Sequence, residues 1–131
     1  MIEFGRREVL VHVRRGDEFL VVRRTDHGYW HTISGGLEAG EDWEDAVMRE
    51  LQEETGLVVE RAAAIGGFEY VREEWERDAG MRVDVRAFVV DAPAGWEPQL
   101  DHEHDAYRWC SRADALELLY WPEPRELLRA V

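Results

Sequence analysis

The chain has almost no cysteine and no long apolar segment. Its 131 residues include one cysteine, Cys110, which excludes an internal disulfide and a zinc site built from several thiolates. No apolar run approaches the roughly 18 residues that a membrane helix needs, and the N-terminal MIEFGRREV lacks the apolar core of a secretion signal. We therefore expect a cytoplasmic protein with no membrane partner, in which Cys110 is a small residue at a strand end.

Positive charge is also scarce. Asp and Glu number 29 against 16 Lys and Arg, and the formal net charge is −13. Such a surface repels a nucleic-acid backbone unless a basic patch or bound cations reverse the local field, so a nucleic-acid polymer is not expected as a partner. Small phosphate compounds remain open, because an acidic cluster can hold divalent cations that bridge to phosphate oxygens.

Length and composition predict one domain over residues 1–131. Hydrophobic residues make up 45% of the chain and charged residues 34%, which is typical of a globular protein with a single core. The sequence contains no internal repeat or low-complexity tract. Nothing in it decides between a monomer and a homodimer.

Strand and turn signals dominate the first 40 residues. The β-rich runs at residues 9–15 and 18–24 are separated by Gly16-Asp17, a two-residue turn typical of an antiparallel hairpin. Residues 25–40 contain four glycines, and we expect an irregular loop there, of the kind on which binding residues often lie.

A helix and further strands are predicted for the rest of the chain. Residues 42–55 form the helix, with Asp42 as its N-cap and Gly56 as its C-terminal stop. Strand-like stretches follow at 57–75, 81–91 and 106–110, and helices at 111–120 and 123–131. This order predicts the α/β class, with helices on both faces of a mixed sheet.

The helix at 42–55 places acids where a solvated helix does not need them. At about 100° per residue, Glu50 and Glu54 fall within the apolar arc, and Glu53 lies at its edge; that arc consists of Trp43, Ala46, Val47 and Leu51. These carboxylates repel one another and are costly to desolvate unless protons or cations neutralise them. Oxygen donors on a rigid scaffold suit Mg²⁺ or Mn²⁺, whereas a solvated acidic helix end is the alternative.

The residues around this helix complete a longer pattern, G-x5-E-x7-R-E-U-x-E-E-x-G-U, in which U is a bulky aliphatic residue. Chance agreement at so many positions is expected in roughly one of 10⁹ windows. The pattern resembles the signature of the Nudix (MutT-like) hydrolases and implies a Nudix α/β/α sandwich with a mixed sheet and the loop-helix-loop of the family. The matching residues are Gly35, Glu41, Arg49, Glu50, Leu51, Glu53, Glu54, Gly56 and Leu57.

The resemblance also implies roles for these residues. The expected ligands of Mg²⁺ or Mn²⁺ are Glu50, Glu53, Glu54 and the backbone carbonyl of Gly35. Arg49 is expected to orient Glu50 through a charge-assisted bond, with Glu41 as a second partner behind the ligands. In such enzymes the ions polarise a diphosphate and activate a water. The residues expected to take part in catalysis are Glu50, Glu54, Arg49 and Glu103.

The segment around Glu103 has its own alternatives. Family members often place a further acidic ligand or the general base in such a loop, so Glu50 and Glu103 are both candidates for the base. A solvated loop glutamate is the other interpretation. His102 and His104 are expected to be hydrogen-bonding loop residues rather than ligands, because a magnesium site favours oxygen donors.

Two segments indicate a narrower resemblance. Residues 29–35 and 103–109 look like those of the bacterial dihydroneopterin triphosphate pyrophosphohydrolases, also described as dATP pyrophosphohydrolases. Arg23 and Arg24 are candidates to bind a phosphate, with solvation at a strand edge as the alternative. Trp30 is a candidate to stack on a base or pterin ring, with packing under the loop as the alternative.

We therefore expect metal-dependent hydrolysis of a nucleoside or pterin triphosphate to a monophosphate and pyrophosphate. A dinucleoside polyphosphate or nucleotide sugar stays open as substrate, because the motif acts on the diphosphate and not on the attached group. A non-catalytic nucleotide sensor and a purely structural cation site are further alternatives, which the intact motif disfavours.

Overall fold

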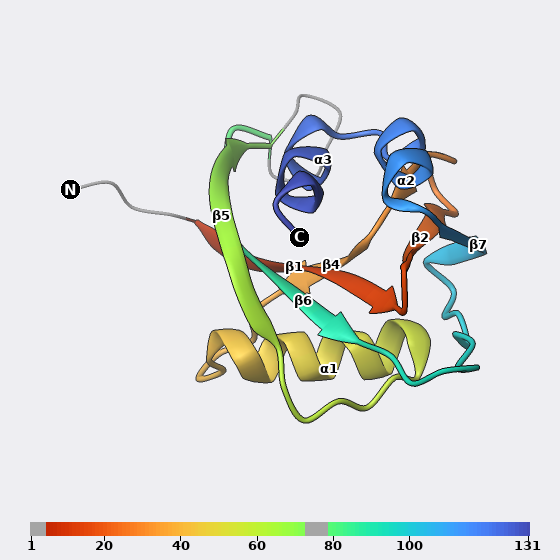
Figure 1. Ribbon diagram of the computed structural model, residues 1–131. Helices are drawn as coiled ribbons and strands as arrows, with labels where there is room; N and C mark the ends of the chain where they lie inside the picture. The colour runs from red at the N-terminus through yellow and green to blue at the C-terminus, as the bar shows by residue number, and fades with distance from the viewer. Residues whose placement is uncertain (1–4, 73–78) are drawn as a thin grey trace.

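The computed structural model, which describes residues 5–72 and 79–131, has three layers (Figure 1). A mixed sheet lies in the middle, with helix α1 (Trp43–Thr55) on one face. Helices α2 (Arg112–Leu118) and α3 (Pro122–Arg129) cover the other face. The predicted α/β/α sandwich is confirmed. Within the described residues, no helix is long and apolar enough to cross a membrane.

The sheet is organised around its first strand, β1. This strand pairs in parallel with β6 and antiparallel with β2 and β4, while β5 extends the sheet beyond β6, and β3 and β7 both pair with β2. The predicted hairpin is therefore β1–β2. The strands are β1 (Arg6–Arg15), β2 (Glu18–Arg24), β3 (Trp30–His31), β4 (Ile33–Gly36), β5 (Ala63–Val71), β6 (Arg82–Asp91) and β7 (His104–Cys110).

The prediction of an irregular loop at residues 25–40 was wrong, because β3 and β4 lie inside it. The glycines of β4 serve close approach rather than a turn. A Cβ atom on Gly35 would lie 2.1 Å from Cδ of Glu50, and one on Gly36 would lie 2.6 Å from Nη2 of Arg6. Composition hid the strand, since glycine usually weakens strands except where another group comes this near.

The strand expected at residues 57–75 also needs correction. Its first part, residues 57–62, is not strand, and β5 begins only at Ala63. Positions 73–75 lie outside the described residues. The strand expected at 81–91 is β6, which pairs antiparallel with β5.

The core lies on both faces of the sheet. One cluster joins α1 to the sheet through residues such as Val11, Val22 and Leu51, and a second joins α2 and α3 to β2 through Phe19 and Val21. Because helices cover both faces, β1 and β2 have nearly continuous apolar runs instead of an alternating pattern.

Helix α1 begins and ends where the sequence predicts. Oδ1 of the N-cap Asp42 accepts a hydrogen bond from the Asp45 amide at 2.8 Å. At the other end Gly56 has a φ of 80°, a left-handed conformation that favours glycine, and its amide bonds to the Gln52 carbonyl at 3.0 Å. The buried apolar arc then fixes the rotation of α1, so that Glu50 and Glu54 face the protein interior.

His12 is a buried polar residue in the middle of β1. Its side chain is 1% exposed, and its Nε2 lies 3.0 Å from the Pro124 carbonyl of α3. Burial lowers the pKa of His12 to about 4. The ring is therefore neutral at pH 7 and donates its Nε2 proton to that carbonyl.

We expect acid to destabilise the fold through His12. The unfolded chain, in which the pKa of histidine is about 6.5, takes up a proton on this ring that the folded chain does not accept until about pH 4. The stabilising contribution of neutral His12 is therefore complete above about pH 6.5 and is lost as the pH falls toward 4.

Urea unfolding at several pH values between about 5 and 7.5 measures this effect. The His12→Gln variant keeps a hydrogen-bond donor but cannot titrate, so its free energy of unfolding should fall less steeply as the pH is lowered. The slopes of the wild-type protein and the variant should differ by up to about 1.4 kcal/mol per pH unit. Equal slopes in the two proteins would contradict the prediction.

Candidate active site

A cavity of about 360 Å³ lies among β1, β4, β5 and the start of α3. Four glutamates, Glu8, Glu50, Glu103 and Glu123, line it together with the cationic side chains of Arg6, Arg24 and Arg72. Concave spaces in which a few polar groups converge are the usual form of small-molecule sites. Opposite charges in its wall suit a ligand that carries both phosphate groups and metal ions.

Glu50 is held directly against β4. It is 8% exposed, and its carboxylate occupies the space into which a side chain at position 35 would extend. Burial raises the pKa of Glu50, while the hydrogen bond and charge of Arg49 oppose that shift. Gly35 is therefore the residue that lets this carboxylate sit between helix and strand.

Arg49 connects the charged residues of the motif. Its Nε and Nη2 donate to the two oxygens of Glu41 at 2.8 and 2.9 Å. Nη1 donates to Glu50 Oε1 at 2.8 Å and to Glu53 Oε2 at 3.3 Å, and Nη2 also reaches the Gly36 carbonyl at 2.7 Å. These bonds raise the pKa of Arg49 and lower that of Glu41. The guanidinium thus holds helix, loop and strand in one arrangement.

Glu54 has the least favourable environment for a charge. It is 1% exposed, and neither carboxylate oxygen has a hydrogen-bond partner among residues 5–72 and 79–131. Burial raises the pKa of Glu54 to about 10, and the nearby carboxylates of Glu50, Glu103 and Asp101 contribute to the shift. Without a cation this carboxyl is therefore protonated at neutral pH, and as an anion it needs a cation beside it.

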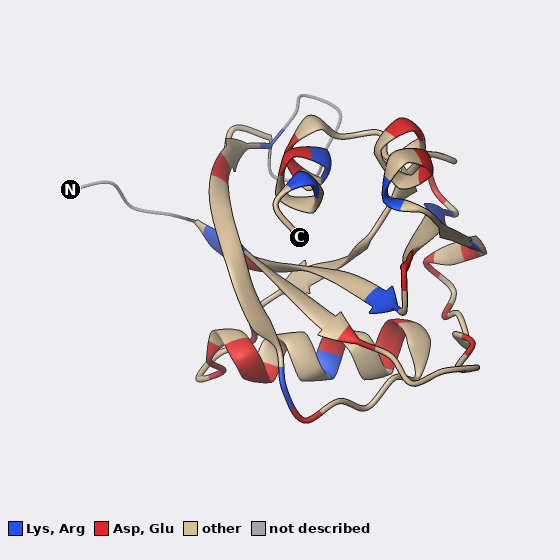
Figure 2. Cartoon of the chain, viewed as in Figure 1, with Lys and Arg blue, Asp and Glu red and all other residues tan. Residues whose placement is uncertain are grey.

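Glu53 differs from the other two helix glutamates. Its side chain is 56% exposed, and it pairs with Arg49. Figure 2 shows acidic residues both along α1 and in the segment that leads to β7. The helix therefore presents Glu50 and Glu54 toward the interior and Glu53 at the rim, next to a second acidic segment.

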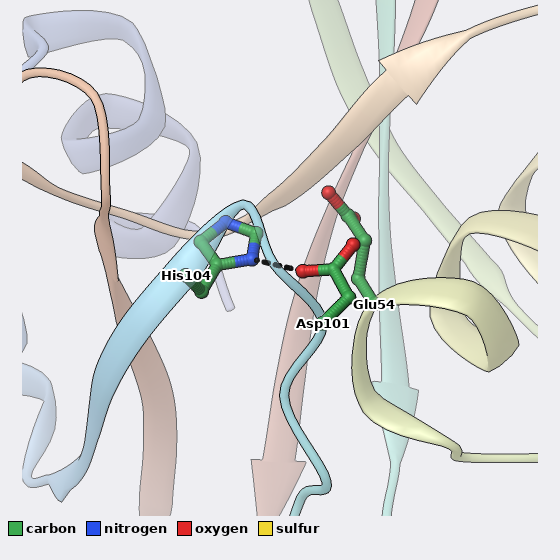
Figure 3. Close-up of side chains that lie close together, drawn as sticks. All are labelled: Glu54, Asp101 and His104. Carbon is green, nitrogen blue, oxygen red and sulfur yellow. Dashed lines mark hydrogen bonds and ion pairs between the residues drawn. The ribbon is translucent and has the colours of Figure 1, made fainter.

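That second segment brings Asp101 and His104 beside Glu54 (Figure 3). His104 is 4% exposed, and its Nδ1 lies 3.2 Å from Oδ1 of Asp101. One potential ligand atom from each of the three residues lies within 4.8 Å of the others. No sequence motif marks Asp101, because the spacing Asp-x-x-His that it forms with His104 is too common to indicate a metal site alone.

Of the residues predicted to bind substrate, Arg24 lines the cavity, whereas Arg23 and Trp30 do not. Arg24 is half-buried and lines the cavity, with its Nη1 3.9 Å from Glu103 Oε2. Arg23 does not line it and instead forms an exposed ion pair with Asp105 at 3.2 Å. Successive side chains of a strand point to opposite faces, which is why the two arginines part.

Trp30 does not line the cavity either. It packs against the core cluster beneath α2 and α3. The neighbouring Tyr29 does line the cavity, as does Trp121, whose ring meets that of Tyr29 edge-on at 5.9 Å. No sequence motif joins these two residues, since they come from segments about 90 positions apart.

The sequence model described as the NUDIX domain matches residues 5–131. An octanoyltransferase of Myxococcus xanthus is 36% identical over 126 residues, covering 88% of this chain and 33% of that protein. The CTP pyrophosphohydrolase of Escherichia coli (strain K12) is 33% identical over 103 residues, covering 79% of this chain and 70% of that protein. The chain spans only 31–40% of the length of the first curated relatives that it matches.

The fold also matches solved structures. The E. coli dihydroneopterin triphosphate pyrophosphohydrolase aligns with a TM-score of 0.85 over 97% of this chain and 96% of that one, at 21% sequence identity. At this identity the likeness establishes the architecture and not the substrate.

We expect Gly35→Ala to weaken the binding of divalent cations. Its new Cβ would lie 2.1 Å from Cδ of Glu50, so the carboxylate must leave its position, and the affinity for Mn²⁺ should fall by about tenfold or more. Titration of Mn²⁺, followed by electron paramagnetic resonance of the free ion, measures the change.

Gly36→Ala is the matched control. The three atoms nearest to its added Cβ all belong to the guanidinium of Arg6, a flexible side chain that can move, and affinity should stay within about twofold. An unchanged affinity in Gly35→Ala, with circular dichroism showing a folded protein, would contradict the expected role of Gly35.

Proposed function

Because this chain belongs to the NUDIX domain family, we propose that it hydrolyses a nucleoside or pterin triphosphate to a monophosphate and pyrophosphate with the help of divalent metal. The observation that carries the proposal is the buried Glu54 carboxyl, which lacks a hydrogen-bond partner in the described residues and lies near a cavity lined by Glu50 and Glu103. A bound cation would neutralise the buried Glu54 carboxylate and would also lie close to the acidic residues of the cavity.

The residues present fit Mg²⁺ or Mn²⁺. Glu50 and Glu54 supply oxygen donors from one side of α1, Glu53 supplies a third from the rim, and the Gly35 carbonyl is a candidate for a fourth. Hard divalent cations take such oxygen ligands, and their charge offsets the cost of burying Glu54 as an anion. When bound, the metal polarises the diphosphate and makes a bound water more acidic.

Side chains of the protein have three further proposed roles, which are to accept a proton, to position Glu50 and to bind phosphate. Glu50 and Glu103 both line the cavity and are the two carboxylates proposed to accept a proton from the attacking water. Arg49 and Glu41 act as positioning residues, because their paired hydrogen bonds hold Glu50 in place. Arg24 is the phosphate-binding arginine in this proposal, since it lines the cavity and Arg23 does not.

The organic group of the substrate is a finer proposal. We assign its ring contact to Tyr29 and Trp121, which line the cavity, in place of Trp30, which packs in the core. Aromatic side chains of this kind stack on planar rings such as a base or pterin. The name of the E. coli relative, CTP pyrophosphohydrolase, supports a triphosphate substrate. A dinucleoside polyphosphate or a nucleotide sugar is the alternative, because the carboxylates act on the diphosphate alone.

We expect the wild-type protein, supplied with Mg²⁺ or Mn²⁺, to release pyrophosphate and a monophosphate from at least one triphosphate in a panel. The panel also contains dinucleoside polyphosphates and nucleotide sugars, and chromatography resolves the products. Glu54→Gln should lower kcat by about 100-fold or more, because it removes a proposed metal ligand.

Glu44→Gln is the control for this variant, since Glu44 is an exposed acid in the first turn of the same helix. Full turnover by folded Glu54→Gln would refute the proposed metal centre. Nucleotide binding without any product from the wild-type protein would favour the non-catalytic sensor.

A second pair of variants tests the phosphate contact. Arg24→Ala should raise KM by about tenfold, because a charge-assisted hydrogen bond contributes about 1.5–3 kcal/mol. Arg23→Ala, one residue away on the same strand, should leave KM within about twofold. Steady-state kinetics on the best panel substrate measures both, and a larger effect at Arg23 would reverse the assignment.

A further inference from the structure

The group formed by Glu54, Asp101 and His104 includes two residues outside the motif. Only Glu54 comes from α1, while Asp101 and His104 come from the segment that enters β7. Figure 3 shows the Glu54 side chain next to Asp101, with the His104 ring on the opposite side of the Asp101 carboxylate. The group is thus assembled by tertiary structure from parts 47 and 50 residues apart in the sequence.

The segment that carries Asp101 and His104 is docked at both ends. The Gln99 amide donates to the Thr55 carbonyl at the end of α1 at 2.9 Å. The Thr25 amide donates to the Glu103 carbonyl at 2.8 Å, and its hydroxyl donates to the His102 carbonyl at 3.1 Å. These bonds place the segment against α1 and the end of β2 before any ligand arrives, as a preorganised site requires.

The distances suit a single ion. Two ligands at right angles, each bonded at about 2.1–2.2 Å, lie roughly 3 Å apart, and two opposite ligands lie roughly 4.3 Å apart. His104 Nδ1 and Asp101 Oδ1 are separated by 3.2 Å, and all three potential ligand atoms lie within 4.8 Å of one another. Small side-chain movements would bring them to one centre.

Hydrogen bonding accounts for only part of the group. Asp101 Oδ1 accepts from the Glu103 amide at 3.2 Å and lies within hydrogen-bond distance of His104. Both oxygens of Glu54 stay buried without a partner among the residues described. With both carboxyl groups ionised and the imidazole neutral, the group would carry two negative charges, which one divalent cation would balance.

We propose that Glu54, Asp101 and His104 form a second divalent metal site, in which Nδ1 of His104 is a nitrogen ligand. Imidazole favours first-row transition ions over Mg²⁺, which prefers oxygen donors throughout. The site therefore favours first-row transition ions over Mg²⁺, and Mn²⁺ is the paramagnetic probe among them. This inference departs from the expectation that His104 is only a hydrogen-bonding residue. This inference rests on the proposed function in one respect, because Glu54 is also a proposed ligand of the helix metal centre.

Pulsed electron paramagnetic resonance of Mn²⁺ bound to the whole protein tests the proposal without any substrate. The wild-type protein should show the nitrogen-14 modulation of a directly bound imidazole, and protein made with nitrogen-15 histidine should show the corresponding nitrogen-15 modulation instead. His104→Gln should lose the histidine signal and bind Mn²⁺ about tenfold more weakly. His102→Gln, at an exposed histidine of the same segment, should keep both the histidine signal and the wild-type affinity for Mn²⁺.

The outcomes separate this inference from the proposed function. Mn²⁺ bound by oxygen ligands alone in the wild-type protein would overturn the inference and leave the helix centre standing. Absence of Mn²⁺ binding would overturn both, and a histidine signal that persists in His104→Gln would also overturn the assignment. If His104→Gln does not fold, the isotope comparison in the wild-type protein still decides whether histidine is a ligand, and folded Asp101→Asn should weaken Mn²⁺ binding.

Discussion

The burial of the Glu54 carboxyl is the constraint on which the site depends. Helix α1 must bury Ala46, Val47 and Leu51 to complete the core, and Glu54 shares their arc, so the same packing that stabilises the helix takes this carboxyl out of water. Burial raises its pKa to about 10, and the ionised form becomes favourable only beside a cation. Stability of the fold and the proposed binding of metal therefore depend on one packing arrangement.

Arg49 relieves this constraint for Glu50 but not for Glu54. The guanidinium bonds to Glu41, Glu50 and the β4 backbone, and the absence of a side chain at Gly35 gives the Glu50 carboxylate its place. None of these contacts reaches Glu54, whose neighbours are the acidic and imidazole groups of the segment that enters β7. Because the Arg49 guanidinium reaches Glu50 and not Glu54, the Glu50 carboxylate has a cationic partner and the Glu54 carboxyl has no hydrogen-bond partner among the described residues.

Local patterns predicted the hairpin, the limits of α1 and the family, because turn residues, caps and the motif each lie within a short stretch of chain. The same reasoning failed at β4, where Gly35 and Gly36 indicated a loop although close approach to neighbouring side chains requires them. It proposed Arg23, Arg24 and Trp30 as a group, but the alternation of a strand and the packing of the core leave only Arg24 at the cavity.

The sequence by itself determined the chemistry of α1, since spacings of three and four residues place carboxylates on one side of any helix. It also determined the family, through identities spread over 23 consecutive residues. Only the tertiary structure decided which carboxylates are buried, which side chains line the cavity, and that Asp101 and His104 meet Glu54. Those contacts depend on how the segment before β7 docks on α1, and a relation across about 50 residues has no periodicity by which a sequence could reveal it.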